Sequence, residues 1–504
     1  MSEIIISTLN ARYIHASLGA RYLYANMGEL KVITEIQEYI INTRPIDIAE
    51  KLLASNPKIV GLGIYIWNVD QSTELAGLIK TISPETILIL GGPEISYETS
   101  QQKIVEYADY VITGQADFAF AELCNKIYKG EAPADKIICS DLPKLDQITY
   151  PYDDLTDEDI SNRVIYVEAS RGCPFKCEFC LSSLDKTALP FNLDNFLAEL
   201  QKLYDRGVRQ FKFVDRTFNL KIQSSIRVLE FFLQKLDEDL FLHFELIPDH
   251  LPEKLKEIIK KFPDGSLQFE IGIQSFDDNT QKIISRKQDN NKTNENIIWL
   301  KNETSAHLHT DLIVGLPGES IETFATGFNK LVKLNPHEIQ VGILKRLRGT
   351  PIIRHTKEYN IRYNPVAPYN ILSNRDISFN DMQRMNRFAR YWDMIANSGR
   401  FKNSLPVILN ESPFQRFMSL SDWLFESTGQ THKISLNRLF TLLFDAMTVC
   451  LNVSEDIATA CLTDDFNRSR LKGHPVFNRM DNKPVNDIVS KTEKSHAKRQ
   501  ARHL

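Results

Sequence analysis

The sequence predicts an α/β protein in which two successive domains built on parallel sheets precede a mostly α-helical region. Three observations support this fold class. Short β-branched runs alternate with helical patterns over residues 1–128, and the alternation restarts at residue 164 and continues to residue 344. Strands and helices that alternate along a chain form βαβ units with parallel, covered sheets. Amphipathic patterns at helical spacing after residue 370 indicate the helical region.

Composition indicates a soluble protein with several domains. The chain has 504 residues, which exceeds one ordinary hydrophobic core. Apolar residues make up 42% and charged residues 25%, as in globular proteins. The formal net charge of −5 shows no basic excess, so nucleic-acid binding is not indicated for the chain as a whole.

The N-terminal segment predicts a cytoplasmic protein. It begins MSEIIISTLN, with no cationic region before its apolar run, so it does not read as a signal peptide. No uninterrupted apolar stretch approaches the ~18 residues that suggest a membrane span. In a reducing cytosol disulfides are improbable, so the seven cysteines are expected to be free thiols or metal ligands.

The first predicted domain carries glycine-rich loops at its strand ends. Its strands are expected at 3–7, 32–36, 59–65, 86–90 and 110–113. Open parallel sheets bind ligands at the carboxyl ends of their strands. Gly91 and Gly92 follow the fourth strand and allow a sharp turn close to a bulky ligand, although a plain tight turn explains such a pair equally well.

A second β/α domain follows a polar segment that reads as a linker, residues 131–161. Its six strands are expected at 164–169, 210–215, 241–246, 267–273, 307–315 and 338–344. Such a sheet is either open or closed into a partial (β/α)6 barrel. Catalytic residues on this scaffold gather at the carboxyl ends of the strands.

Three cysteines crowd into the loop after the first of these six strands. Cys173, Cys177 and Cys180 are spaced Cys-x3-Cys-x2-Cys, and no second cysteine pair exists elsewhere. Structural zinc normally takes four ligands, usually as two separated pairs, so it fits poorly. Three thiolates on one loop suit three corners of a cubane 4Fe–4S cluster and leave the fourth iron open to a non-protein ligand.

This cysteine loop resembles that of the radical S-adenosylmethionine (SAM) enzymes, with Phe179 in the aromatic position. Three further stretches resemble family motifs in the expected order: FVDRTFN (213–219), FEIGIQSFDDNT (269–280) and TDLIVGLPGES (310–320). A fourth, LKRLRGTPI (344–352), resembles the motif of the sixth strand. Four motifs at strand ends make the resemblance specific.

The resemblance implies a set of residues that bind SAM. Asp215 would face the amino group of SAM, and Arg286 would face its carboxylate. Glu245 is a candidate SAM or substrate contact, with an outward-facing, salt-bridged glutamate as the equal alternative. The remaining implied SAM contacts are Phe179, Gln274, Ser275, Gly315, Gly318 and Glu319.

The first domain in turn resembles the flavodoxin-like or Rossmann-like cobalamin-binding domain of one radical SAM subfamily. The matching stretches are GLGIYIWN (61–68), LGGPE (90–94) and DYVITGQADFAF (109–120). The resemblance implies that Gly63, Gly91, Gly92 and Gly114 make room for the nucleotide tail of cobalamin.

His15 is the candidate for a protein ligand to cobalt. Another class of cobalamin methyltransferases carries Asp-x-His-x-x-Gly in this loop. Here the loop reads LNARYIHASLG, in which His15 lies one residue further from Gly19 and no aspartate stands two residues before it. A polar histidine near the corrin is therefore favoured over an axial ligand.

The last third of the chain is predicted to be helical and is assigned no chemistry. Ser378 and Asp381 are spaced as in a capping box, and methionines and aromatic residues follow at helical spacing. The predicted domains are residues 1–130, 162–365 and 366–475, with a basic polar tail over 476–504. The third domain resembles a C-terminal domain of unknown role that accompanies this subfamily.

Together these resemblances imply a radical SAM enzyme that holds a 4Fe–4S cluster and cobalamin. SAM would be cleaved reductively to a 5′-deoxyadenosyl radical, and methylcobalamin would methylate an unactivated carbon of an unknown substrate. An external donor such as flavodoxin or ferredoxin would supply the electron. One alternative is a cobalamin-dependent oxidoreductase or cyclase that transfers no methyl group. The other is an iron–sulfur regulator or RNA-binding protein that uses the basic tail.

Overall fold

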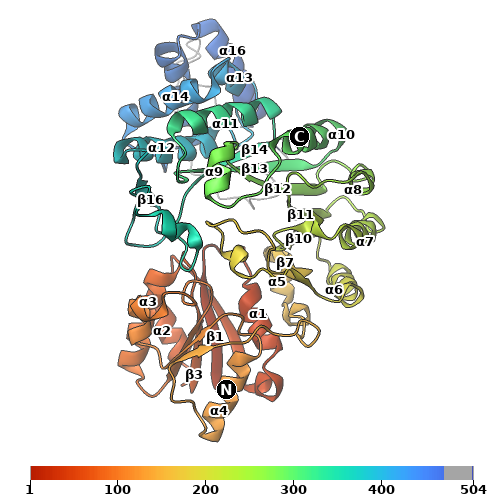
Figure 1. Ribbon diagram of the computed structural model, residues 1–504, viewed down its shortest axis with the longest axis vertical. Helices are drawn as coiled ribbons and strands as arrows, with labels where there is room; N and C mark the ends of the chain where they lie inside the picture. Colours follow the sequence, from red (N-terminus) through yellow and green to blue (C-terminus); the bar gives the residue numbers. More distant parts are fainter. Residues whose placement is uncertain (1, 470, 472–501, 503–504) are drawn as a thin grey trace.

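The computed structural model describes residues 2–469, 471 and 502, and Figure 1 shows three successive units along its long axis. The N-terminal unit, red to orange, lies at one end, and the helical C-terminal unit, blue, lies at the other. The central unit lies between them. The basic tail predicted for residues 476–504 lies, except for residue 502, outside the described residues.

The N-terminal sheet has six parallel strands in the order β2-β1-β3-β4-β5-β6. The strands are β1 (Ile4–Asn10), β2 (Thr34–Ile40), β3 (Ile59–Gly63), β4 (Ile87–Gly91), β5 (Tyr110–Thr113) and β6 (Ile137–Cys139). The first five confirm the predicted strands. The sixth differs, because it lies in the segment expected to be a linker and extends the sheet by pairing with β5.

Alternating side chains give this sheet one apolar core on each face. Ile5 packs with Leu75 and the other buried residues of helices α2 (Pro45–Leu53) and α3 (Val69–Ile82). Its neighbour Ile4 packs on the opposite face with Phe120 and the buried residues of α1 (Leu18–Ala25) and α4 (Ala119–Lys129). Successive residues of a strand point to opposite faces, so a continuous isoleucine run is what a doubly covered sheet requires.

The central sheet is also six-stranded and parallel, in the order β14-β13-β12-β11-β10-β7, and it is open between its two edge strands. Its strands are β7 (Ile165–Val167), β10 (Gln210–Phe213), β11 (Phe241–Leu246), β12 (Leu267–Gln274), β13 (His307–Val314) and β14 (Glu338–Ile343). Its helices are α6 (Leu193–Asp205), α7 (Ile222–Leu233), α8 (Glu253–Ile259), α9 (Asp278–Ile283), α10 (Asn290–Glu303) and α11 (Ile321–Leu334). This arrangement confirms the partial (β/α)6 barrel.

Smaller elements join these domains. Helix α5 (Asp157–Asn162) lies in the connecting segment, and two short antiparallel pairs follow: β8 (Ser170–Arg171) with β9 (Leu189–Pro190), and β15 (Arg362–Tyr363) with β16 (Ile371–Ser373). The 3-10 helix η7 (Pro351–His355) comes after the last strand of the barrel. Both β8 and η7 flank the cysteine loop and help to position it.

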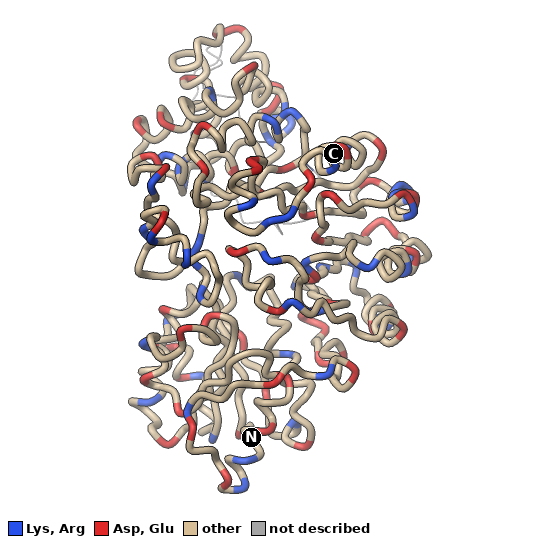
Figure 2. The backbone as a smooth tube through the Cα atoms, in the orientation of Figure 1, with Lys and Arg blue, Asp and Glu red and all other residues tan. Residues whose placement is uncertain are grey.

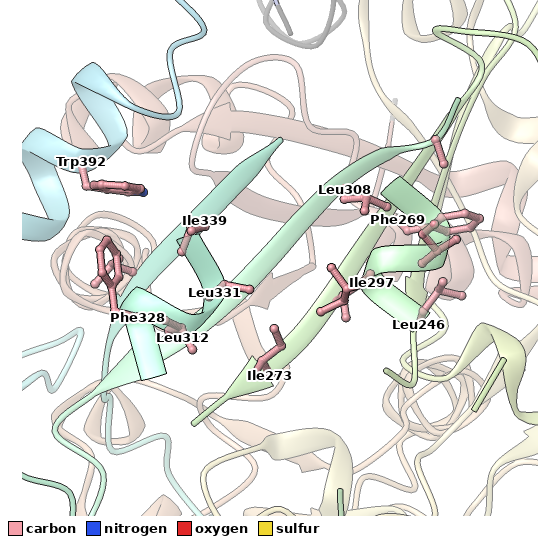
Figure 3. Packing of buried hydrophobic residues seen from close by; sticks show 14 of the residues in the cluster. Leu246, Phe269, Ile273, Ile297, Leu308, Leu312, Phe328, Leu331, Ile339 and Trp392 are labelled. Carbon is pink, nitrogen blue, oxygen red and sulfur yellow. The ribbon is translucent and has the colours of Figure 1, made fainter. Parts of the chain in front are cut away.

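The C-terminal unit is helical, as predicted. It consists of α12 (Phe379–Ile395), α13 (Ser404–Leu409), α14 (Pro413–Thr428), α15 (Leu436–Asp445), a π-helical turn (Ala446–Cys450) and α16 (Glu455–Arg468). The Ser378 side chain accepts a hydrogen bond from the Asp381 backbone N–H and so caps α12. Phe328 of the barrel and Trp392 of α12 face each other in Figure 3, which joins this unit to the barrel core. Within the described residues, no helix is long and apolar enough to cross a membrane.

Candidate active site

The three cysteines of the motif line one cavity of about 220 Å³ at the carboxyl ends of the central strands. They lie on the loop between β8 and the next 3-10 turn. Gly172, at φ +86°, opens this loop, and a Cβ there would lie 2.9 Å from the backbone of Ala188. The Cys173 N–H donates to the Asp185 carbonyl at 2.8 Å, which holds the start of the loop in place.

The donor set fits a cubane cluster. All three thiols are free, and Cys173 and Cys177 are buried. Burial raises the pKa of both thiols, so a bound metal would stabilise their thiolates. Among the described residues, no three side chains converge as ligands of a single ion. A cubane does not require such convergence, because each thiolate binds a different iron.

Arg286 reaches the same cavity from the loop after α9. Its guanidinium donates to the Gly272 carbonyl and to Gln288 Oε1, and Nη1 lies 3.6 Å from Cys177 Sγ. Gln274, at the end of β12, also lines the cavity and has a φ of +70°. The structure thus brings Arg286, Gln274 and Phe179 together with the cysteines.

Glu245 combines a feature of each alternative considered for it, because it lines the cavity and also forms an ion pair. Its Oε1 accepts from Arg216 Nη1 at 2.6 Å. Burial raises the pKa of Glu245, and the Arg216 charge opposes that rise. The carboxylate is therefore held by a cation of the protein itself.

Asp215 lies elsewhere than expected. Its carboxylate accepts hydrogen bonds from the Ala169 N–H at 2.9 Å and the Ser170 hydroxyl at 2.5 Å, and it does not line the cysteine cavity. Burial raises the pKa of Asp215 to about 7. Both carboxylate oxygens of this buried side chain thus have hydrogen-bond donors after β7, as a buried carboxyl group requires. In this structure it ties β10 to the start of the cysteine loop.

The wall of the cavity does not include four further predicted residues, Ser275, Gly315, Gly318 and Glu319. The Ser275 hydroxyl donates to Glu319 Oε1 at 2.5 Å, and Glu319 Oε2 is buried without a hydrogen-bond partner among the described residues. Gly315 and Gly318 have φ of +92° and +82°, and a Cβ on them would meet Ile371 at 2.8 Å and Ile283 at 2.6 Å. Close packing accounts for both glycines.

A second cavity, of about 410 Å³, opens at the carboxyl ends of the N-terminal strands. Gly63, Gly91, Gly92 and Gly114 all line it, as the sequence predicted. Gly92 has a φ of +107°, and a Cβ there would lie 2.6 Å from the Ile64 carbonyl oxygen. Gly92 therefore lets the loop after β4 pass close to Ile64 at the wall of this cavity.

The second cavity lies between the two β/α domains. Its wall includes Arg171, Gly172, Asp185 and Arg216 of the central domain. Arg216 also lines the cysteine cavity, so the two cavities meet at this side chain. Figure 2 shows Lys and Arg residues on the loops where the central and N-terminal units face each other.

His15 does not line the glycine-rich cavity. It lines a third one, of about 320 Å³, where the central strands begin. Its Nδ1 lies 2.7 Å from the Tyr166 hydroxyl. The reason is a backbone pairing, since the Val164 N–H donates to the Ile14 carbonyl at 2.8 Å and draws this loop to the central domain. The expectation of a histidine near the corrin is therefore corrected.

Sequence reasoning did not single out the charged residues beside the motifs. Arg171, two residues before Cys173, donates to Asp117 at 2.8 and 3.0 Å and pairs with Glu168 at 2.8 Å. Glu178, between two motif cysteines, is buried among three donor side chains. The sequence could have singled out Arg171 and Glu178 only by their position inside or next to the cysteine motif. Their roles were not predictable, because most of their partners are distant in sequence.

Three family models match the chain in succession. The B12 binding domain matches residues 4–124, and the Radical SAM superfamily matches residues 167–330. The chain therefore contains a B12-binding domain followed by a radical SAM domain. A third model, described only as a protein of unknown function (DUF4080), matches residues 357–502.

These domains indicate which cofactors the protein binds. A radical SAM domain implies a 4Fe–4S cluster and SAM, and a B12-binding domain implies cobalamin. The cavity lined by Cys173, Cys177 and Cys180 fits the 4Fe–4S cluster and SAM, and the glycine-lined cavity fits cobalamin.

Several curated proteins and solved structures are similar to this protein. The cobalamin-dependent radical SAM methyltransferase TokK of Streptomyces tokunonensis is 22% identical over 66% of this chain and 54% of its own. Across the first three curated relatives the match spans 44 to 54% of their length, so the chain covers about half of them.

Two solved structures share the fold. The radical SAM methyltransferase TsrM of Kitasatospora setae, with tryptophan and a SAM analogue bound, superposes with a TM-score of 0.58 at 14% identity over 73% of this chain and 80% of its own. The apo form of the cobalamin-dependent enzyme OxsB superposes with a TM-score of 0.61 at 14% identity, over 92% of this chain and 83% of its own.

Proposed function

We propose that this protein is a cobalamin-dependent radical SAM methyltransferase that acts on an unactivated carbon. The observation that carries the proposal is the shared wall of the two cavities at Arg216. A methyl group can pass only between groups that lie close together, so the two cofactor sites need a common boundary. When bound, the cluster and SAM supply a carbon-centred radical, and methylcobalamin supplies a methyl group.

The chain's own part is to bind, orient and exclude water. Under this proposal Cys173, Cys177 and Cys180 each hold one iron, and Arg286 and Gln274 orient SAM in the cavity that they line. The Arg216–Glu245 pair, at 2.6 Å, forms the partition where the substrate would enter. The names of the relatives support methyl transfer, since TokK and TsrM are both called methyltransferases.

We further propose that the electron comes from an external donor of the flavodoxin or ferredoxin type, in the cytoplasm. Reductive cleavage of SAM consumes one electron, and the free thiols fit a reducing compartment. We propose that the substrate is a molecule small enough to reach Arg216, the side chain that lines both cavities.

The test begins with cluster reconstitution under strict anaerobiosis. The protein, supplied with SAM and dithionite, is expected to form 5′-deoxyadenosine, and its methylated product is expected to gain the mass of one CH2. Cys177→Ala should lose both activities because it removes one iron ligand. Cys139→Ala is the matched control, since this thiol is free, exposed and outside the cavity.

Two results would count against the proposal. If Cys177→Ala still formed 5′-deoxyadenosine, a cluster held by this cysteine would not be needed for the cleavage of SAM. A product of unchanged carbon count, formed with cobalamin bound, would favour an oxidoreductase or cyclase instead.

A further inference from the structure

We propose that Glu178 is a positioning residue that fixes the cysteine loop against Arg286. The inference rests on the proposed function in one respect, the cluster at Cys173, Cys177 and Cys180. Glu178 lies between the second and third of these cysteines in sequence, and its side chain is only 3% exposed.

The Glu178 carboxylate accepts hydrogen bonds from three side chains. Oε1 accepts from the Ser285 hydroxyl and from Arg354 Nη2, each at 2.5 Å. Oε2 accepts from Arg354 Nε at 2.8 Å and lies 2.9 Å from His355 Nε2. A buried carboxylate needs partners of this kind, and here both oxygens have them.

The backbone of the same residue is tied to the same two segments. The Glu178 N–H donates to the Ile284 carbonyl at 3.1 Å, and the Glu178 carbonyl accepts from the Ile352 N–H at 3.0 Å. One of these segments follows α9, and the other is η7 beyond the last barrel strand. One residue of the cysteine loop is thus bonded both to the segment that leads to Arg286 and to η7.

The contacts form a closed circuit around Cys177. Glu178 follows Cys177, Ser285 bonds Glu178, and Arg286 follows Ser285. Arg286 Nη1 returns to Cys177 Sγ at 3.6 Å. Moving the Glu178 carboxylate therefore shifts both a cluster thiol and the guanidinium expected to face SAM.

The cysteine loop depends on these contacts because it has little regular secondary structure of its own. Residues 172–180 lie between β8 and a 3-10 turn, without a helix or strand. Side-chain contacts thus decide where the thiols point. Groups that orient metal ligands in this way typically contribute about 10- to 100-fold to metal affinity.

The experiment compares Glu178→Gln with the wild-type protein after anaerobic reconstitution. The amide keeps the size of the side chain but removes the charge that Arg354 and His355 pair with. We expect iron to be lost to a chelator about 10- to 100-fold faster. We also expect the change in the reduced cluster's EPR spectrum on adding SAM to weaken, because Arg286 is displaced.

Asp465→Asn is the matched control. Asp465 is fully buried and accepts from the Asn403 N–H, the Ser404 N–H and the Ser404 hydroxyl at 2.9, 2.8 and 2.6 Å. It lies in α16, remote from the cysteine loop in the fold. Both variants should lower the melting temperature, whereas only Glu178→Gln should change iron retention and the SAM-induced spectrum.

Two milder variants keep the test decisive if Glu178→Gln does not fold. Ser285→Ala removes one donor, and Glu178→Asp keeps the charge with a shorter reach, so both should lose iron at rates between those of wild type and Glu178→Gln. Wild-type iron retention in the folded Glu178 and Ser285 variants overturns the inference, as does equal loss in Asp465→Asn. A wild-type protein that binds no cluster would instead refute the proposed function.

Discussion

Burial sets the protonation of two carboxyl groups in the central domain. Desolvation raises the pKa of Glu319 to about 8 and that of Asp215 to about 7, above the ordinary values of 4.5 and 3.8. Glu319 has only the Ser275 hydroxyl as a side-chain partner, and its second oxygen has none among the described residues. Near neutral pH it is therefore largely a neutral acid.

The raised pKa of Glu319 predicts a specific dependence of stability on pH. A carboxyl whose folded pKa exceeds its unfolded pKa contributes stability that is fully present below pH 4.5 and is lost as pH rises through about 8. Glu319→Gln mimics the neutral form, so it should not lose this stability as pH rises. The difference in unfolding free energy between the variant and the wild type should therefore grow by about 2 to 3 kcal/mol from pH 6 to pH 8, measured by urea denaturation of the cluster-free protein.

An exposed carboxyl supplies the control for that measurement. Glu257→Gln changes a surface residue of the same domain and should shift stability little at either pH. An equal response of Glu319→Gln and wild type at pH 6 and pH 8 would contradict the prediction.

At the scale of elements, the loop after β4 depends on one glycine more than on its neighbour. A Cβ on Gly92 would lie 2.6 Å from the Ile64 carbonyl oxygen, at a φ of +107°. A Cβ on Gly91 would meet only the Ile112 carbonyl oxygen, at 3.7 Å. The two substitutions therefore separate backbone strain from the loss of a glycine as such.

Gly92→Ala should destabilise the N-terminal domain by about 1 to 3 kcal/mol, because both the contact and the backbone conformation are strained. It should also reduce cobalamin retention, read from the absorption of the purified protein. Gly91→Ala is the matched comparison and should keep the stability of the domain. Equal stability of the two variants would show that the close approach to Ile64 does not matter.

The packing of α11 on α12 makes a second prediction at this scale. Phe328 is fully buried, and its ring centroid lies 4.7 Å from that of Trp392 and 5.2 Å from that of Phe388. Phe328→Ala should cost about 3 to 5 kcal/mol in unfolding free energy, since it opens a cavity where the barrel meets the helical domain. The exposed Ile298, changed to Ala, is the comparison and should cost well under that amount.

At the scale of the whole molecule, charged bridges hold the B12-binding domain on the barrel. Arg348 donates to Glu94 at 2.8 Å and to Glu98 at 2.9 Å, and the Tyr369 hydroxyl donates to Glu94 at 2.8 Å. Arg171 makes a corresponding bridge to Asp117. Asp117 and Arg171 line the glycine-lined cavity, and Glu94 follows two residues after Gly92 of the same cavity wall.

Breaking one of these bridges should loosen the domains. Arg348→Met leaves Glu94, which is 4% exposed, without its cation, at a cost of about 3 to 5 kcal/mol. The double variant Arg348→Met with Glu94→Gln should recover part of that cost, because no buried charge remains. Hydrogen exchange across residues 87–98 measures the loosening.

The exposed pair Lys260–Glu303 is the control for the bridge. Its side chains are 45% and 49% exposed, so Lys260→Met should cost no more than about 1 kcal/mol. A double variant as unstable as Arg348→Met alone would show that the charge on Glu94 is not the cause.

The sequence by itself determined the domain order, the eleven expected strands and the cysteine motif. Short β-branched runs and the Cys-x3-Cys-x2-Cys spacing are local patterns, so they can be recognised in the sequence without knowing which segments become neighbours. The first-domain glycines belong to the same class, because Gly92 needs a backbone conformation that a side chain would strain. The sequence did not reveal β6, since a three-residue strand at a sheet edge carries too short a pattern.

Only the tertiary structure decided where the polar side chains point. Asp215 turns to the Ala169 N–H and the Ser170 hydroxyl, His15 follows its loop to Tyr166, and Glu319 is not part of the cavity wall. Arg216 and Glu178 acquire their roles through partners 29 to 177 positions away. Such contacts depend on which strands and loops become neighbours, and no local pattern in a single sequence encodes that.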